Sequence, residues 1–190
     1  AESIHGLEYA DDLRALRAGR ALSALDLERA DALCDYLAQV HGMRGGESGL
    51  YERRIRHTLG HGECIFGVVD SYDDQRYFAA LHDIERRCVD CRWRLKHRAW
   101  RLRQVHGDFH PWNIMFREGP DFSVLDRSRG EWGEPADDVA ALAINYLFFG
   151  MRKAARGGDR GMAEPFRRLF HEFLGTYMHV SGDHELLETL

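Results

Sequence analysis

The feature that most restricts the fold of this chain is a polar stretch that runs into two short apolar segments. The stretch QVHGDFHPWNIMF, residues 104–116, holds two histidines, an aspartate and an asparagine, and Pro111 keeps it from continuing as a helix. The apolar runs IMF and FSVLD are separated by REGPD, which has the glycine and proline of a turn. The sequence therefore predicts a polar loop that leads directly into a small antiparallel hairpin.

Such a hairpin would bring three oxygen-bearing side chains together. Asp108 and Asn113 lie on the loop, and Asp126 ends the second strand. Because a hairpin returns the chain to its starting point, we expect Asp126 to lie close to the other two. Carboxylate and amide oxygens suit Mg²⁺, which binds one or two carboxylates and completes its shell with water and substrate phosphates. A further carboxylate beside the metal is what phosphoryl transfer needs to orient an attacking hydroxyl.

Apolar residues spaced three or four apart predict helices over most of the remaining chain. The first is expected to begin with Asp26 as its N-cap, to end at Gly42 and to carry His41 on its apolar stripe. Further helices are expected up to Leu59, over about residues 75–103, from Asp137 or Asp138 to Phe149, and over a final amphipathic segment that includes Phe166 and Tyr177. The fold class is therefore α+β and mainly helical.

Composition excludes several classes of protein. With 44% hydrophobic and 30% charged residues among 190, the chain has the makeup of one globular domain. Its net charge of −5 argues against a nucleic-acid partner. Its longest apolar run, VAALAINYLFF, is shorter than the roughly 20 residues of a membrane span, so no membrane partner is expected. Four scattered cysteines and the lack of a signal sequence predict a reducing, cytoplasmic location.

The polar stretch and the block after it resemble the aminoglycoside phosphotransferase family of kinase-like enzymes. HGDFHPWN has the family's H-G-D-x-H-x-x-N spacing, which parallels H-R-D-L-x-x-x-N of protein kinases. FSVLDRSRGEWGEPADDVAAL is similar to the family's next block, in which a strand, an aspartate and a Gly-x-Pro loop precede an aspartate that opens a buried helix. ALCDYLAQVHG is similar to the helix that precedes the loop in these enzymes.

The resemblance implies an ATP- and Mg²⁺-dependent phosphotransferase. It would transfer the γ-phosphate to a hydroxyl of a small acceptor such as an aminoglycoside, an amino-alcohol or a sugar. Asp108 would be the catalytic base, and Asn113 and Asp126 would be the magnesium ligands. A non-catalytic pseudokinase, an interaction module, or a fragment that is inactive without its ATP lobe is the alternative.

Four further residues receive roles from the same resemblance. His106 would hold the backbone of the loop, and Asp138 would brace the loop from the buried helix. His110 and Trp112 would shape the acceptor pocket or the loop. The family often has glycine at the position of Trp112, so this indole either lines the pocket or packs against the protein.

The resemblance covers the C-terminal lobe of a kinase-like fold. Kinases carry a Gly-rich phosphate loop and a strand lysine in their N-terminal lobe. No G-x-G-x-x-G occurs in this chain, and its only lysines, Lys96 and Lys153, are misplaced for that role. We therefore expect one C-lobe over residues 1–190, with helices over 1–104, the catalytic loop and hairpin over 105–126, and C-terminal helices over 127–190. The ATP-binding N-terminal lobe is expected upstream.

Two other interpretations of the polar loop remain open at this point. The pattern H-x-D-x-H offers His106, Asp108 and His110 to a transition metal. Alternatively, the loop is a polar turn whose side chains hydrogen-bond to one another and bind no ligand.

Two further patterns are interpreted as structural. Cys88 and Cys91 form C-x-x-C, but no second pair accompanies them, so we expect cysteines in a core rather than a zinc or redox site. The basic run RRCVDCRWRLKHRAWRLR is expected to be a solvated helix face with packed Trp93 and Trp100.

Overall fold

Helices make up most of the chain, and its strands are short. The computed structural model describes residues 6–60, 64–127, 131–157 and 161–190. The α-helices are α1 (Tyr9–Ala18), α2 (Ala24–His41), α3 (Ser48–Gly60), α4 (Ile65–Asp70), α5 (Phe78–Leu95), α6 (Pro135–Arg156), α7 (Glu164–Ser181) and α8 (Leu186–Thr189). The mainly helical α+β class is confirmed. None of the described helices is both long and apolar enough to cross a bilayer.

The strands form two small antiparallel sheets. They are β1 (Leu7–Glu8), β2 (Arg103–Gln104), β3 (Ile114–Phe116), β4 (Phe122–Val124) and β5 (Trp132–Gly133), in the orders β1-β3-β4 and β2-β5. Short 3₁₀ turns occupy Gln75–Tyr77 (η1), Ala99–Arg101 (η2) and Pro111–Asn113 (η3). The predicted hairpin is β3 and β4, with Ile114 opposite Val124. Part of the loop expected after it, residues 128–130, lies outside the described ranges.

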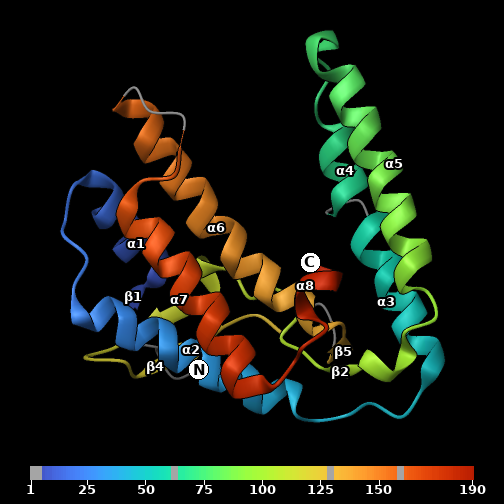
Figure 1. Ribbon diagram of the computed structural model, residues 1–190, viewed down its shortest axis with the longest axis horizontal. Coiled ribbons are helices and arrows are strands. Elements are labelled where there is room, and N and C mark those ends of the chain that lie inside the picture. Colours follow the sequence, from blue (N-terminus) through green and yellow to red (C-terminus); the bar gives the residue numbers. More distant parts are fainter. Residues whose placement is uncertain (1–5, 61–63, 128–130, 158–160) are drawn as a thin grey trace.

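The main body packs α1, α2, α6 and α7 around one aromatic core (Figure 1). Phe116 and Phe173 are buried in it, and the hydroxyls of Tyr9 and Tyr146 hydrogen-bond to each other at 2.9 Å. This bond satisfies two polar groups that would otherwise be costly to bury. The core fixes α6 against the hairpin, which matters because α6 carries Asp138.

Helix α2 begins three residues earlier than the sequence predicted. Its N-cap is Ser23, whose hydroxyl accepts from the Asp26 amide at 3.4 Å while the Asp26 carboxylate accepts from the Ser23 amide at 2.8 Å. This reciprocal pair is a capping box, so Asp26 lies in the first turn and is not the cap. The predicted end at Gly42 and the buried stripe that includes His41 are confirmed.

Helices α3, α4 and α5 form an arm that extends away from the main body (Figure 1). Helix α5 ends at Leu95, and the expected helix over 75–103 is therefore too long at both ends. After Leu95 the chain turns through η2 into β2, which pairs with β5. A small second core, which includes Tyr51, Ile55 and Leu102, joins the base of the arm to this turn.

The outer face of the arm is more exposed than the sequence predicted. Trp93 is 57% and Trp100 is 61% exposed, so neither indole is packed. Cys88 and Cys91 are free and only partly buried, and Cys91 packs against the small second core. Leu95 is the only buried residue of α5, so the apolar spacing along this helix belongs to a partly exposed face.

Candidate active site

The polar loop is held by one buried carboxylate on α6. Asp138 accepts hydrogen bonds from the backbone amides of His106 and Gly107, both at 2.7 Å, and is fully buried. Gly107 has a φ of 88°, a conformation that favours glycine. Two charge-assisted bonds to adjacent amides fix the direction of the chain immediately before Asp108.

His106 locks the loop to the hairpin. Its Nδ1 accepts from the Asp108 amide at 3.3 Å, and its Nε2 donates to the Leu125 carbonyl at 2.9 Å. Burial lowers the pKa of His106, and the nearby Asp138 carboxylate and the Leu125 carbonyl only partly oppose this. The ring is therefore neutral near pH 7, and both of its nitrogens are engaged by the backbone.

Asp108 and Asn113 lie on the same turn of the loop. The amide nitrogen of Asn113 donates to the Asp108 carbonyl at 3.0 Å, so its amide oxygen points away from that bond. The Asp108 carboxylate is 17% exposed and lies 3.7 Å from Nε2 of His110. Asp108 is thus partly accessible, and the backbone is held before it by Asp138 and at its carbonyl by Asn113.

Asp126 lies at the same end of the hairpin as Asn113. The Leu125 amide donates to the Asn113 carbonyl at 2.8 Å, which continues the pairing of Ile114 with Val124 by one residue. Asp126 follows directly and is exposed, with a φ of 54°. A left-handed conformation is uncommon outside glycine, and it turns the chain sharply at this point. The predicted approach of Asp126 to the loop is therefore consistent with the strand register.

The donors at this end of the hairpin suit a hard cation. Among the described residues, no group of three or more His, Cys, Asp or Glu side chains could hold a metal ion, and both ring nitrogens of His106 are engaged. The described residues therefore give no support to the H-x-D-x-H interpretation. The Asn113 amide oxygen and the Asp126 carboxylate fit Mg²⁺, which needs only one or two carboxylates from the protein.

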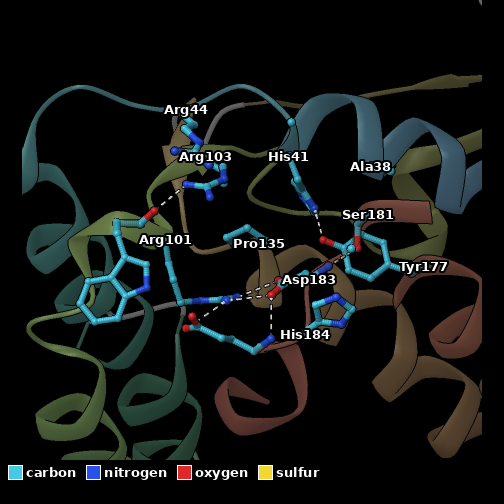
Figure 2. A pocket seen from close by; sticks show the side chains of 14 residues that line it. Ala38, His41, Arg44, Arg101, Arg103, Pro135, Tyr177, Ser181, Asp183 and His184 are labelled. Carbon is cyan, nitrogen blue, oxygen red and sulfur yellow. Dashed lines mark hydrogen bonds and ion pairs between the residues drawn. The ribbon is translucent and has the colours of Figure 1, made fainter. Parts of the chain in front are cut away.

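His41 supports Asp138 from behind, a role that the sequence did not predict. Its Nε2 lies 3.1 Å from the Asp138 carboxylate, and its Nδ1 lies 2.7 Å from the Tyr177 hydroxyl (Figure 2). His41 is only 5% exposed. The position of a histidine within an otherwise apolar helix stripe indicated a buried polar contact. Its partner could not be predicted, because Asp138 lies 97 residues away in the sequence.

Arg54 on α3 connects the arm to the loop. Its Nη2 donates to the Gly107 carbonyl at 3.1 Å and to the Asp137 carboxylate at 3.0 Å. Gly107 is therefore held at both backbone groups: Asp138 accepts from its amide, and Arg54 donates to its carbonyl. This contact could not be predicted from the sequence, because Arg54 lies in a helix with two other arginines, Arg53 and Arg56.

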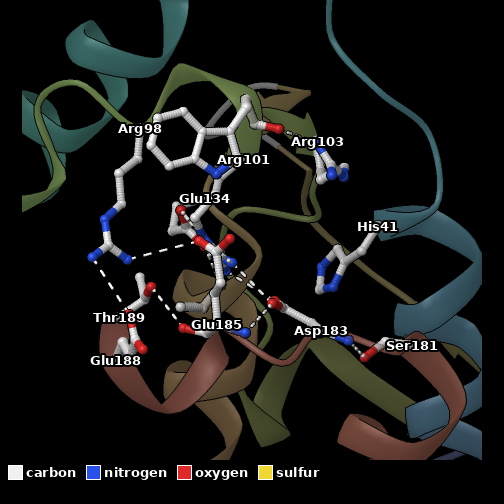
Figure 3. Close-up of polar contacts among 12 residues, drawn as sticks. His41, Arg98, Arg101, Arg103, Glu134, Ser181, Asp183, Glu185, Glu188 and Thr189 are labelled. Carbon is white, nitrogen blue, oxygen red and sulfur yellow. Dashed lines mark hydrogen bonds and ion pairs between the residues drawn. The ribbon is translucent and has the colours of Figure 1, made fainter.

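The start of α6 is fixed by a buried ion-pair network (Figure 3). Arg101 pairs with Glu134 and, through two nitrogens at 2.8 and 2.9 Å, with Asp183. Glu134 is the N-cap of α6 and also accepts from the Tyr51 hydroxyl at 2.7 Å. Since Asp138 lies one turn further along α6, this network positions the carboxylate that holds the loop.

His110 and Trp112 lie on the outer side of the loop. Their rings meet edge to face at a centroid distance of 5.7 Å, and the Trp112 ring also lies 6.3 Å from the Phe149 ring. Trp112 is 37% exposed, and the Arg14 guanidinium lies 5.9 Å from its ring centroid. Trp112 therefore packs against the main body on one side and reaches the surface on the other.

Comparison with known proteins gives one family match and several structural likenesses. Residues 7–171 match the sequence model of the phosphotransferase enzyme family, APH. No curated protein gives a significant match.

Solved structures that resemble the chain include two crystal forms of a glucosamine kinase and a glucosamine kinase in complex with glucosamine, ADP and inorganic phosphate. Sequence identities are 20–22% and TM-scores 0.59–0.61 over 94–98% of this chain, a likeness that shows the fold alone. The chain spans about half the length of these structures, 48–49%.

Proposed function

Because the chain belongs to the phosphotransferase enzyme family, we propose that it forms the C-terminal, acceptor-side lobe of an ATP-dependent small-molecule kinase. The observation that carries the proposal is the loop itself. Asp108 is partly exposed on a backbone fixed by Asp138, with Asn113 and Asp126 at the adjoining end of the hairpin. This arrangement supplies the carboxylate and the hard oxygen donors that phosphoryl transfer requires.

Asp108 acts as the base that orients the acceptor. Its carboxylate accepts the hydrogen bond of the acceptor hydroxyl, whose oxygen then bonds to the γ-phosphorus of ATP. The bond from that phosphorus to the bridging oxygen breaks, ADP leaves, and the hydroxyl proton passes to Asp108. Most of the rate gain in such a step comes from positioning and electrostatics, which is why a rigid loop matters.

Asn113 and Asp126 would hold Mg²⁺, which would supply positive charge to offset the negative charge of the nucleotide phosphates. His106 and Asp138 contact neither substrate and act by fixing the loop. His110 and Trp112 border the loop where an acceptor would approach.

The acceptor lies between the arm and the start of α6. A groove of about 240 Å³ is lined there mostly by apolar side chains, with Thr58 and Asp137 among its polar residues. Arg54 links Asp137 to Gly107, the loop residue next to Asp108, and this link supports the groove as the acceptor site. Since one structural neighbour contains glucosamine, amino sugars are the first acceptors to test.

The nucleotide contacts come partly from an N-terminal lobe. The sequence of residues 1–190 has no Gly-rich phosphate loop and no lysine suited to pair with the phosphates. We therefore assign ATP binding to both lobes together, in the cytoplasm, where ATP and reduced cysteines are expected.

The test is Mg²⁺-dependent ATP turnover by the full-length protein that contains these residues. The acceptor panel holds glucosamine, other sugars, amino-alcohols and aminoglycosides, and residues 1–190 alone are assayed beside it. Acceptor-dependent turnover in the full-length protein would support the proposal. No ATP turnover with any acceptor, together with no binding of Mg²⁺–ATP, would favour a pseudokinase or an interaction module.

A further inference from the structure

A second pocket lies behind the loop, away from the residues assigned to catalysis. Its volume is about 400 Å³, within the range of small-molecule sites. The end of α2, the start of β2 and the end of α7 form its walls, and neither Asp108, Asn113 nor Asp126 lines it. Figure 2 shows Arg44 and Arg103 together on one wall, with His41 and Tyr177 on another.

Arg44 and Arg103 are directly opposite each other across an antiparallel bridge. The Gln104 amide donates to the Met43 carbonyl at 2.9 Å and the Gly45 amide donates to the Leu102 carbonyl at 3.2 Å, on either side of this pair. Like charges at directly opposite positions destabilise paired strands. The backbone thus holds two guanidinium groups next to each other at the edge of a pocket.

The carboxylates of the pocket are engaged elsewhere. Asp183 forms two hydrogen bonds with Arg101, and Glu185 lies 3.8 Å from the same guanidinium (Figure 3). At the pocket, the Gly42 amide caps the Ala38 and Val40 carbonyls of α2, and the Gly182 amide caps the Met178 carbonyl of α7. These groups therefore offset the charge of the opposed arginine pair only in part.

Among the described residues, the side-chain hydrogen bonds of the pair go to neutral carbonyls and not to carboxylates. Arg103 donates to the carbonyls of Trp100 and Leu102, which are neutral. Arg44 makes no side-chain ion pair with any of the described residues. Burial, then the charges of Arg44 and Arg101, lower the pKa of Arg103, and the charges of Asp183 and Glu134 only partly oppose this. The electrostatic environment at Arg103 is therefore one that an anion would relieve.

We propose that this pocket binds the phosphate group of a small phosphorylated molecule, with Arg44 and Arg103 as its ligands. A guanidinium presents a planar fork of donors, and one fork is enough to occupy both oxygens of a carboxylate. A terminal phosphate offers three oxygens and accepts two forks at once, so it matches a pair of arginines better. The rest of the pocket, beside Trp100, leaves room for the organic part of the ligand.

The position of the pocket connects it to the loop. Arg103 lies on β2, which leads directly into the loop, and His41 in the pocket wall contacts Asp138. A ligand that bridges Arg44 and Arg103 would tie the segment after α2 to β2. The proposal concerns binding at this pocket and does not rest on the proposed catalytic function.

The test is a titration of ¹⁵N-labelled chain followed by amide chemical shifts. Inorganic phosphate, glucose 6-phosphate and succinate are the three probes. Saturable shifts are expected at Gly42, Arg103 and Gly182 with both phosphates, and binding of succinate is expected to be at least 10-fold weaker. Tighter binding of glucose 6-phosphate than of phosphate would identify an organic phosphate as the ligand, and equal binding would identify free phosphate.

Three variants locate the site. Arg44→Gln and Arg103→Gln are each expected to weaken phosphate binding at least 10-fold, and Arg44→Gln preserves folding because its side chain is exposed. Arg86→Gln on the arm, which removes the same charge from a side chain that is 68% exposed, is expected to change the Kd less than 2-fold. No saturable binding, an unchanged Kd in Arg44→Gln, or equal weakening in Arg86→Gln would each overturn the proposal.

Discussion

Replacing Asp138 with asparagine tests the support of the loop without changing side-chain volume. In the wild type, one carboxylate oxygen accepts from the Gly107 amide, and the other accepts from the His106 amide and faces Nε2 of His41. An asparagine side chain has one acceptor oxygen and one NH₂ group. In either orientation the NH₂ group faces a backbone N–H, so at least one buried amide loses its acceptor.

The size of the effect follows from these contacts. An unsatisfied buried donor costs about 1–3 kcal/mol, and the loss of a charged acceptor weakens the bonds that remain. We therefore expect Asp138→Asn to lower the free energy of unfolding by about 2–4 kcal/mol, a large part of the 5–15 kcal/mol typical of a domain. Asp121→Asn on the hairpin turn, where the side chain is 66% exposed, should leave the free energy of unfolding close to the wild-type value.

Urea unfolding followed by circular dichroism measures both variants. With a urea dependence of roughly 2 kcal/mol per M, Asp138→Asn should shift the midpoint down by about 1–2 M. Amide hydrogen exchange at His106 and Gly107 should become faster by a larger factor than exchange in α7. An Asp138→Asn protein with the wild-type midpoint and wild-type exchange at both amides would refute this account of how the loop is held.

Three other predictions concern His106, Arg101 and Asp126. Because the folded pKa of His106 lies below its unfolded value of 6.5, unfolded chains bind more protons, and the stability present above pH 6.5 should decrease as the pH falls below it. His106→Asn should show a smaller decrease in urea titrations between pH 7.5 and 5.5, and an equal decrease would contradict burial of a neutral ring. Arg101→Met should cost about 3–5 kcal/mol in unfolding free energy because it leaves buried carboxylates unpaired, whereas Arg98→Met, with exposed partners, should cost less than about 1 kcal/mol. Asp126→Val should be about 1–2 kcal/mol less stable than Asp126→Asn, since a β-branched residue tolerates a φ of 54° poorly, and equal melting temperatures would argue against that conformation.

Local patterns predicted the elements that depend on neighbours in the sequence. The turn residues of REGPD and the apolar runs around it were enough to predict the β3–β4 hairpin. The stripe of α2 and that of α7 were predicted correctly because each is buried against the other helix. The hairpin prediction also placed Asp126 at the end of the second strand, and in the structure it follows Leu125, whose amide donates to the Asn113 carbonyl.

Contacts between distant segments left no comparable signal. The apolar spacing of α5 continues through Ala99 and Leu102, and so it predicted a helix where the chain turns into η2 and β2. The pairing of His41 with Asp138 and that of Arg101 with Glu134 depend on how α6 packs in three dimensions. Each residue alone had an ordinary interpretation, as a core histidine or a solvated arginine.

The proposed function depends on Asp108, which would orient the acceptor hydroxyl in a kinase reaction. Its most direct test is kcat for acceptor phosphorylation by the full-length protein with Mg²⁺ and ATP, in the wild type, Asp108→Asn and Asp121→Asn. The account predicts that Asp108→Asn lowers kcat by about 10²–10⁴-fold with wild-type folding, while Asp121→Asn is unaffected. Comparable kcat values for Asp108→Asn and the wild type would contradict it.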